Sequence, residues 1–424
     1  MTLSLGIDLG TSGVRSAVVD GDGTVLSMAR GTYGAQTGSR LNAETWWDGA
    51  RECLTAQIAD LRTKGIAPDA ITCIGVDGTS GSMVLTDATS APVTHALMYN
   101  DGGFDAEAAQ IGLHAPVGHI TRGANSALAR LLHLKSMAPD ATHLLHQADF
   151  IAARLIGQAG QSDENNALKT GFDPETGNWP DWFDDLGISS LLPQVHPAGS
   201  PVAQIDAVIA AKFGLSRNTV IHVGTTDSIA AFLAAAPLKT GAAVTSLGTT
   251  LAIKMMCDTR IEDASIGLYS HKLGGGWLVG GASNTGGGVL RQHFTDAQVA
   301  ELSQRIDPTI PSELNYYPLT KPGERFPIND PDLQPRLEPR PDDPAAFLAG
   351  LLEGIARIEK DCFDAMIARG APRPEPLLTA GGGAKNETWT RIRSRVLKQD
   401  VQIAEHTEAA IGTARLIGNV RQAG

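Results

Sequence analysis

The stretch LSLGIDLGTSGVRSAVVD, residues 3–20, decides the fold that this sequence predicts. Apolar residues alternate with small or polar ones from Leu3 to Leu9, which is the pattern of a half-buried strand and puts Asp8 on its polar face. The glycines within residues 10–13 predict a tight turn with uncovered backbone N–H groups, and a second strand follows at once. A carboxylate beside such donors suits a magnesium-bound phosphate chain, but an ordinary Gly-rich hairpin also explains these residues.

The composition of the 424-residue chain limits the classes of protein to which it can belong. A chain of this length exceeds one typical domain, so two domains are expected. The formal net charge of −12 argues against nucleic acid or an anionic membrane surface as partner. The four cysteines have no CxxC spacing and are expected to be buried thiols in a reducing compartment. Without a secretory signal or an apolar run that could span a bilayer, we expect a cytoplasmic protein.

The hairpin at the start of the chain has a second copy. Residues 243–254, AVTSLGTTLAIK, repeat the order of strand, Leu-Gly-Thr turn and strand. Two copies of a phosphate-type hairpin suggest a duplicated architecture with its ligand between two lobes. The signatures GxxxxGK[ST], GxGxxG, HExxH and GxSxG do not occur in the sequence. A phosphate site would therefore have to use the two Leu-Gly-Thr hairpins.

Asp227 is the most informative single acidic residue. It follows the strand expected at residues 220–224 and precedes the helix expected at residues 228–236. Aspartate favours the N-cap position of a helix, and that role alone would need no catalysis. A carboxylate at the carboxyl end of a strand also lies where α/β proteins bind ligands, and the helix would keep it ionised to accept a proton from a sugar hydroxyl. The residues leave both interpretations open.

Three further segments carry candidate functional residues. Residues 381–386 are a glycine run between a strand and a helix, either a turn that needs positive φ or a flat backbone ledge against a nucleotide base or ribose. Asp101 lies in an Asn-Asp-Gly-Gly turn, where turn chemistry alone is the alternative to a role in binding. Residues 161–182, rich in Asn, Asp, Gly and Pro, are predicted to form a long irregular loop, and such loops are often functional.

Taken together and in this order, the segments resemble the FGGY family of carbohydrate kinases and, through it, the fold of actin, hexokinase and the Hsp70 ATPase. The resemblance covers nearly the whole chain and rests on the motifs GIDLGTSGVRSAVVD, GTTDSIAAF, AVTSLGTTLAIK, GGASNTGGG, TAGGGAKNETW and EAAIGTA. Within the family, a further set of motifs looks most like the D-ribulose kinases of cyanobacteria and plants: DGTSGSM, QADF, SDENNALKTGF, GTTDSIAAFLA, YSHKLGG and GERFPI.

The resemblance implies an α/β protein with two ribonuclease-H-like domains, of the actin, hexokinase and Hsp70 type, which face each other across a cleft. Residues 1–234 would form an N-terminal sugar-binding domain, and residues 235–407 a C-terminal nucleotide-binding domain. The final helix, within residues 408–424, would pack back on the first domain.

The resemblance also gives single residues a role. Asp227 matches the general base, Asp8 the carboxylate for metal and phosphate, and Thr11 the donor to the γ-phosphate, so these three are the expected catalytic residues. The expected metal ligands are Asp8 and Asp227. The expected sugar-binding residues are Asp8, Ser80, Asp101 and Asp227. The expected ATP-binding residues are Gly10, Thr11, Ser12, Gly13, Arg15, Gly248, Thr249, Gly382, Gly383 and Asn386.

Two departures from the family pattern concern the sugar pocket. Many members carry an arginine shortly after the positions that match Asn100 and Asp101, where this chain has two glycines and Phe104. Many xylulose-type members carry histidine where this chain has the Thr79-Ser80-Gly81 turn. Both departures argue against glycerol and D-xylulose as substrates more than they argue against phosphoryl transfer.

The function that the resemblance implies is ATP- and Mg²⁺-dependent phosphorylation of a free ketopentose, D-ribulose to D-ribulose 5-phosphate. The first alternative is a kinase of another sugar or polyol, namely D-xylulose, L-ribulose or glycerol. The second is a nucleotide-dependent ATPase switch like actin or Hsp70. The expected partners are the sugar and ATP, with no nucleic acid and no membrane, and the protein is expected to be a monomer or a homodimer.

Overall fold

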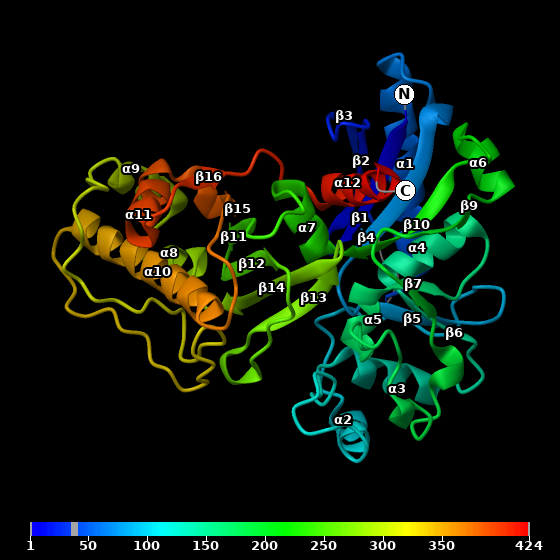
Figure 1. Ribbon diagram of the computed structural model, residues 1–424, viewed down its shortest axis with the longest axis horizontal. Helices are drawn as coiled ribbons and strands as arrows, with labels where there is room; N and C mark the ends of the chain where they lie inside the picture. Colours follow the sequence, from blue (N-terminus) through cyan, green and yellow to red (C-terminus); the bar gives the residue numbers. More distant parts are fainter. Residues whose placement is uncertain (1, 35–40, 423–424) are drawn as a thin grey trace. The chain divides into compact units, whose positions relative to one another are not determined.

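The structure is a computed structural model, and it describes residues 2–34 and 41–422 of the chain. The chain divides into two compact units. Unit 1 consists of Met1–Ala234 together with Glu408–Gly424, and unit 2 consists of Ala235–Thr407. Each unit is built around a six-stranded mixed sheet that carries helices (Figure 1).

The sheet of unit 1 has the strand order β3-β2-β1-β4-β10-β9. Its strands are β1 (Leu3–Gly10), β2 (Gly13–Val19), β3 (Val25–Gly31), β4 (Ile71–Gly78), β9 (Pro201–Gln204) and β10 (Val220–Thr226). β1 is antiparallel to β2 and parallel to β4, and β4 is parallel to β10. The carboxyl ends of β1, β4 and β10 therefore meet at one edge of the sheet, where α/β proteins bind ligands.

Helices cover both faces of this sheet. The helices of unit 1 are α1 (Glu44–Thr63), α2 (Asp105–Gly112), α3 (Ala127–Met137), α4 (Gln147–Ile156), α5 (Glu164–Thr170), α6 (Ala207–Phe213), α7 (Asp227–Ala235) and α12 (Ala409–Gln422). Leu5 and Ile7 of β1 share a core with residues of α1 and α4 on one face. On the other face α12 packs against β1 and β4, so the alternation along β1 directs Gly6 and Asp8 toward α12.

A smaller group of elements extends unit 1 beyond the main sheet. It contains two two-stranded sheets, one of β5 (Met83–Thr86) with β6 (His143–His146) and one of β7 (Gln161–Asp163) with β8 (Gln194–His196). A separate core forms here, mainly from side chains of β5, α3 and the segment before β8. Short 3₁₀ helices of unit 1 lie at Pro68–Ala70, Asp181–Phe183 and Ser189–Leu191.

The loop predicted for residues 161–182 was wrong for residues 161–170, whereas residues 171–180 are irregular as predicted. These residues contain β7 and helix α5, although their composition is that of a loop. The Asp163 carboxylate caps α5 by accepting the N–H groups of Asn165 and Asn166 at 2.8 and 3.0 Å, and Gly171 ends the helix with φ +118°. Asp163 and Gly171 therefore act as the caps of a helix rather than as loop residues.

Unit 2 repeats the plan of unit 1. Its sheet has the order β13-β14-β12-β11-β15-β16, with β11 antiparallel to β12 and parallel to β15, and β15 parallel to β16. The strands are β11 (Ala243–Leu247), β12 (Leu251–Cys257), β13 (Tyr269–Leu273), β14 (Gly276–Ser283), β15 (Leu377–Ala380) and β16 (Val401–Ile403). The antiparallel β11, β12 and β14 match β1, β2 and β3, and the parallel β15 and β16 match β4 and β10. The predicted fold class, two duplicated α/β domains, is confirmed.

The helices of unit 2 are α8 (Gly287–His293), α9 (Asp296–Ser303), α10 (Pro344–Ile367) and α11 (Glu387–Leu397), with 3₁₀ helices η4 (Ala264–Ile266) and η5 (Gly382–Lys385). α10 is the longest and lies against α11 and α9. Its apolar face forms the core of the unit together with β11, β12 and Trp389 of α11.

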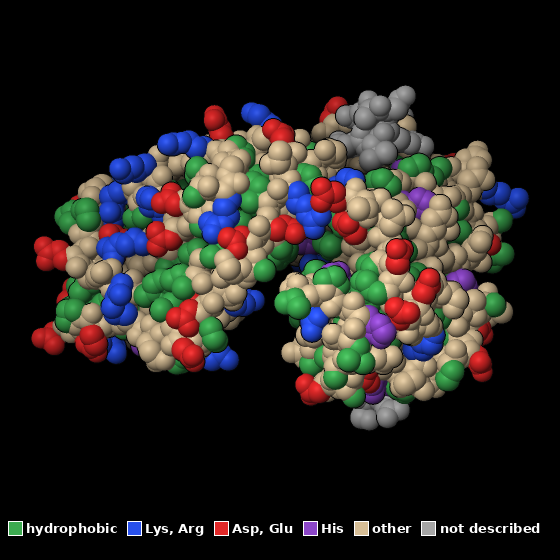
Figure 2. All heavy atoms as spheres, turned by 60° about the horizontal axis from the view of Figure 1, so that its bottom comes forward, with side chains coloured by type: hydrophobic (Ala, Val, Ile, Leu, Met, Phe, Trp, Pro, Cys, Tyr) green, Lys and Arg blue, Asp and Glu red, His purple; other side chains and the backbone are tan. Residues whose placement is uncertain are grey.

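The surface in Figure 2 carries Asp and Glu side chains interspersed with Lys and Arg, and no large patch of one charge dominates this face. All four cysteines are buried and unpaired, as the sequence predicts. Within residues 2–34 and 41–422, no helix is both long enough and apolar enough to cross a membrane.

Candidate active site

Two carboxyl groups lie side by side at the carboxyl ends of β1 and β4. Asp8 and Asp77 are register partners in the parallel pair, so their side chains leave the sheet on the same face. Both are almost fully buried. Their carboxyl groups lie within reach of each other, and a hydrogen bond between them can form only when one of them carries a proton. Asp8 is the residue that the sequence predicted, whereas Asp77 was missed.

Burial dominates the electrostatics of this pair. It raises the pKa of Asp8 above its usual value, although the hydrogen bond with Asp77 and the charge of Arg15 act in the opposite direction. Burial together with the charge of Asp8 raises the pKa of Asp77 well above its usual range. Two adjacent buried carboxyls cannot both ionise without a large cost, so burial favours a neutral carboxyl within the pair.

The turn between β1 and β2 places donors next to this pair. Gly10 and Gly13 close the hairpin as register partners, and Thr11 and Ser12 are exposed at its tip. A Cβ atom at Gly13 would lie 2.8 Å from the carbonyl oxygen of Gly31, so only glycine fits there. The backbone N–H groups and hydroxyls of the tip are therefore available to a ligand.

Arg15 faces Asp8 across the hairpin. Its Nη1 lies 3.3 Å from Asp8 Oδ2, and its Nε lies 3.3 Å from Glu408 Oε2. The sequence predicted Arg15 as an ATP-binding residue. In the structure its guanidinium balances two carboxylates of unit 1.

Asp227 begins α7 directly after β10. Its Oδ1 accepts the N–H of the next residue, Ser228, at 2.6 Å, whereas the bond typical of an N-cap aspartate comes from the N–H two or three residues further on. The side chain is only half-buried, and its charge raises the pKa of Asp77. The structure thus brings Asp8, Asp77 and Asp227 together at one edge of the unit 1 sheet, at the ends of three neighbouring strands.

Lys169 of α5 is a second residue that the sequence analysis missed. Burial lowers the pKa of its ammonium group to about 8, and the charge of Asp227 partly offsets that effect. α5 is fixed to β10 because Asn165 Nδ2 and Asn166 Nδ2 donate to Thr225 Oγ1 and O, each at 3.2 Å. The error in predicting residues 161–182 hid this cation, because a loop gave no reason to place Lys169 beside Asp227.

Arg130 of α3 joins the two loops that carry the predicted sugar-binding residues Ser80 and Asp101. Its buried guanidinium donates to the carbonyl oxygens of Gly81 at 3.1 Å, Asp101 at 2.7 Å and Asn125 at 3.0 Å. No arginine follows Asp101 closely in the sequence, but the fold supplies one from a distant helix. Asp101 itself is exposed, and its Oδ2 accepts the Met98 N–H at 2.7 Å, as in an ordinary turn.

Unit 2 contains a cavity of about 640 Å³, which is within the size range of nucleotide and cofactor sites. It is lined by the β11–β12 hairpin, α8, α9, η5 and the start of α11. All five residues predicted for ATP in this half of the chain line it: Gly248, Thr249, Gly382, Gly383 and Asn386. The structure therefore brings these five together, although they come from two segments more than 130 residues apart.

The glycines of the second segment have different reasons to be glycine. Gly381 adopts φ +85°, and a Cβ there would meet the Leu247 carbonyl oxygen at 2.6 Å. A Cβ at Gly383 would lie 2.7 Å from Trp389 Cζ3. Nothing lies within 4 Å of a Cβ at Gly382, so its bare backbone faces open space. The predicted turn with positive φ is present at Gly381, and the uncovered backbone at Gly382 leaves room for the predicted contact with a nucleotide.

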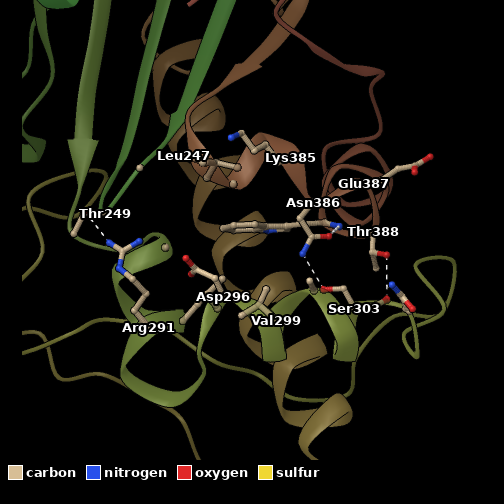
Figure 3. A pocket seen from close by; sticks show the side chains of 18 residues that line it. Leu247, Thr249, Arg291, Asp296, Val299, Ser303, Lys385, Asn386, Glu387 and Thr388 are labelled. Atoms are coloured by element: carbon tan, nitrogen blue, oxygen red, sulfur yellow. Dashed lines mark hydrogen bonds between the residues drawn. The ribbon is translucent and has the colours of Figure 1, made fainter.

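Asn386 has two structural roles at the edge of the cavity. Its Oδ1 accepts the Trp389 N–H at 3.0 Å and caps α11, and its Nδ2 donates to Ser303 Oγ at 2.8 Å. Figure 3 shows this end of the cavity, with Asn386, Ser303 and Thr388 close together.

Arg291 marks the opposite end of the cavity, and the sequence analysis did not single it out. Its Nη2 donates to Thr249 Oγ1 at 2.8 Å, and Figure 3 shows its side chain reaching toward the β11–β12 hairpin. Asp296 lies between the two ends. A guanidinium beside backbone donors of a Gly-Thr turn is a suitable place for phosphate oxygens.

A magnesium ion would have to be held by few protein atoms. Among the described residues, no group of three or more His, Cys, Asp or Glu side chains is placed to hold a metal ion. Mg²⁺ in nucleotide sites typically uses one or two carboxylates, and phosphate oxygens and water complete its shell. Asp8, a carboxylate next to the donors of the hairpin tip, fits that arrangement.

A duplicated α/β fold, with an acidic strand edge in one unit and a nucleotide-sized cavity in the other, is the architecture of the actin-like fold. Residues 3–114 match the N-terminal domain, and residues 243–418 the C-terminal domain, of the FGGY family of carbohydrate kinases. The chain belongs to this family and is an ATP-dependent kinase that phosphorylates a sugar hydroxyl. The predicted enzyme class is confirmed.

Individual relatives are distant. The xylulose kinase of Staphylococcus epidermidis is 23% identical over 441 residues, covering 97% of this chain and 86% of its own length. Among solved structures, the xylulose kinase of Rhodospirillum rubrum has a TM-score of 0.84 at 21% identity, covering 100% of this chain and 90% of its own. The glycerol kinase of Plasmodium falciparum with ADP also has a TM-score of 0.84, at 16% identity and the same coverage. These structures establish the fold of the chain.

Proposed function

We propose that the chain phosphorylates free D-ribulose to D-ribulose 5-phosphate, with Mg²⁺-ATP as phosphoryl donor. In this proposal unit 1 binds the sugar and unit 2 binds the adenosine part of ATP. The observation that carries the proposal is the meeting of Asp8, Asp77 and Asp227 at the carboxyl ends of β1, β4 and β10. That arrangement supplies one carboxylate for a metal–phosphate group and another for a substrate hydroxyl.

The chemistry follows from these assignments. Asp227 accepts the proton of the C5 hydroxyl, whose oxygen forms the new bond to the γ-phosphorus as ADP leaves with the β–γ bridging oxygen. Asp8 would hold Mg²⁺, which when bound neutralises charge on the β- and γ-phosphates. The backbone donors of residues 10–13 and of Gly248 and Thr249 stabilise the charge that develops on the phosphate oxygens. Because the transition state is loose, positioning and electrostatics contribute more than the strength of the base.

Support for a ribulose-type pocket comes from the turn after β4. Thr79 donates from its N–H and Oγ1 to Gln147 Oε1 at 2.9 and 2.7 Å, and Arg130 binds the carbonyl oxygen of Gly81. The turn is thus held on both sides of Ser80, whose side chain is half-buried. A hydroxyl here is much smaller than the histidine of many xylulose-type members, which favours a differently shaped sugar pocket.

D-xylulose is the second candidate substrate. It is favoured by the names of relatives, since the enzymes of S. epidermidis, Streptomyces coelicolor and Bacillus subtilis at 23–26% identity are all xylulose kinases. A change of configuration at one carbon separates the two sugars, and distant identity does not fix such a preference.

The two candidates are separated by ADP release measured with D-ribulose, D-xylulose, L-ribulose and glycerol, and by NMR of the phosphorylated product. We expect kcat/KM for D-ribulose to exceed that for every other sugar by at least about tenfold, with phosphate on C5. A preference for D-xylulose would replace the first candidate by the second. ADP release that is independent of every sugar would contradict both.

A further inference from the structure

Helix α12 crosses the face of the unit 1 sheet that carries Asp8 and Asp77. The crossing is close because glycines remove side chains at the contact. A Cβ at Gly6 of β1 would lie 2.0 Å from the Ala410 carbonyl oxygen, and one at Gly75 of β4 would lie 2.8 Å from Ile417. Each glycine stands two positions before its aspartate, so α12 fixes the strand backbone directly before each carboxyl.

Thr413 of α12 reaches Asp77 from this position. Its Oγ1 donates to Asp77 Oδ2 at 2.5 Å, and both side chains are fully buried. Asp77 Oδ1 is also buried and receives no bond from an N–H or hydroxyl donor of the described residues. The neighbours that can orient the Asp77 carboxyl are therefore the Thr413 hydroxyl and the Asp8 carboxyl.

The same helix acts on the other side of Asp8 as well. Glu408, directly before α12, binds Arg15, which in turn binds Asp8. α12 also contacts α7, the helix that begins at Asp227, since Arg415 Nη1 donates to the Ala234 carbonyl oxygen at 2.8 Å. One helix thus touches the supports of both catalytic aspartates.

We propose that Thr413 is a positioning residue for phosphoryl transfer. Its hydroxyl fixes the orientation of Asp77, and Asp77 in turn holds the Asp8 carboxyl in the orientation needed toward the metal–phosphate group. The inference rests on the proposed role of Asp8 in holding Mg²⁺. A purely structural role for Thr413 would affect stability alone and would leave the metal requirement of the enzyme unchanged.

The test compares Thr413→Val, which keeps the shape but removes the hydroxyl, with Thr413→Ser, which restores it. For each variant we would measure kcat, the Mg²⁺ concentration at half-maximal rate, the KM of the sugar, and Mn²⁺ binding to the ATP complex by EPR without sugar. We expect Thr413→Val to lower kcat about tenfold, to raise the Mg²⁺ requirement and to weaken Mn²⁺ binding severalfold, with the sugar KM unchanged. Thr413→Ser should stay within about twofold of the wild type.

Thr86→Val is the matched control. Thr86 lies in β5, its side chain is fully buried, and its hydroxyl has no hydrogen-bond partner among the described residues. Its loss should leave kcat and the Mg²⁺ requirement unchanged. The proposal would be overturned if Thr413→Val kept the wild-type Mg²⁺ requirement, or if both valine variants lost the same factor in kcat. It would also be overturned if Thr413→Ser did not restore kcat and the Mg²⁺ requirement.

Two further variants make the result independent of folding and of the proposed function. If Thr413→Val does not fold, Asp77→Asn, which keeps the size of the side chain and its acceptor for Thr413, should show the same shift in metal dependence. Asp8→Asn tests the proposed role of Asp8 by itself. An unchanged Mg²⁺ requirement in Asp8→Asn would reject that role. If the Mg²⁺ requirement changes in Asp8→Asn but not in Thr413→Val, only the positioning by Thr413 is rejected.

Discussion

Replacing Glu359 with leucine would leave an unpaired arginine in the core of unit 2. The side chains of Glu359 and Arg393 are fully buried, and Arg393 Nε and Nη2 donate to the two carboxylate oxygens at 2.6 Å each. Thr245 of β11 donates to Glu359 Oε1 at 2.6 Å, and Thr379 of β15 accepts from Arg393 Nη1 at 2.7 Å. The pair thus ties together the two strands that lead into the nucleotide cavity.

The expected cost follows from the isolation of the guanidinium. Breaking a buried ion pair by removing one partner costs about 3–5 kcal/mol, because the remaining charge stays desolvated. Glu359→Leu should therefore lower the free energy of unfolding of unit 2 by about that amount. Replacing both partners, as Glu359→Leu with Arg393→Met, should cost less than either single change, since no charge remains buried. The single variants should also bind ADP more weakly than the double variant, because the unpaired charge that each leaves behind disturbs the core between β11 and β15.

Urea unfolding followed by circular dichroism measures the free energy of unfolding, with each transition analysed separately because the chain has two units. Calorimetric titration measures the affinity for ADP. The reasoning would be refuted by a loss below about 1 kcal/mol in Glu359→Leu. It would equally be refuted if the double variant lost the sum of the two single losses, since the residues would then not be coupled.

Three further predictions address the two halves of the site. Asp227→Asn should lower kcat by at least about 100-fold and leave ADP binding unchanged, and near-normal turnover in an ADP-release assay would reduce Asp227 to a helix cap. Gly382→Ala should leave thermal stability unchanged, because nothing lies within 4 Å of the new Cβ, but it should raise the KM of ATP severalfold. Gly383→Ala should instead lower the melting temperature, because its Cβ would approach Trp389 to 2.7 Å. An unchanged KM of ATP in Gly382→Ala would argue against a nucleotide on that backbone. Arg291→Met should raise the KM of ATP about tenfold without changing the KM of the sugar, and steady-state kinetics with both substrates varied would expose the opposite pattern.

The parts of the site that the sequence predicts are those encoded by contiguous residues. In both Gly-Thr hairpins, strand, turn and returning strand lie within one short segment, Leu3–Val19 or Ala243–Cys257, so periodicity and turn chemistry suffice to place Gly10 or Gly248. Asp227 is equally local, because a buried strand ends where it stands and a helix begins. The duplication is visible for the same reason, since each copy repeats a short pattern.

The missed residues reach the site through tertiary contacts. Arg130 enters from α3 and binds Gly81, 49 positions earlier in the chain. Lys169 belongs to a helix of seven residues, too short for apolar periodicity to outweigh a polar composition. Its own sequence neighbours therefore gave no indication that the end of α5 would lie beside Asp227.

Asp77 is different, because a local signal for it exists. Glycine stands two positions before aspartate both in Gly6-Ile7-Asp8 and in Gly75-Val76-Asp77. In a strand this spacing puts both residues on one face, so each glycine admits the crossing α12 and each carboxyl emerges just beyond it. A repeated Gly-x-Asp in two parallel strands therefore predicts a pair of carboxyls under a closely packed helix. The hydrogen bond from Thr413 to Asp77 is not predictable in the same way. Thr413 follows Asp77 by 336 positions, and the contact depends on the register of α12 against the sheet.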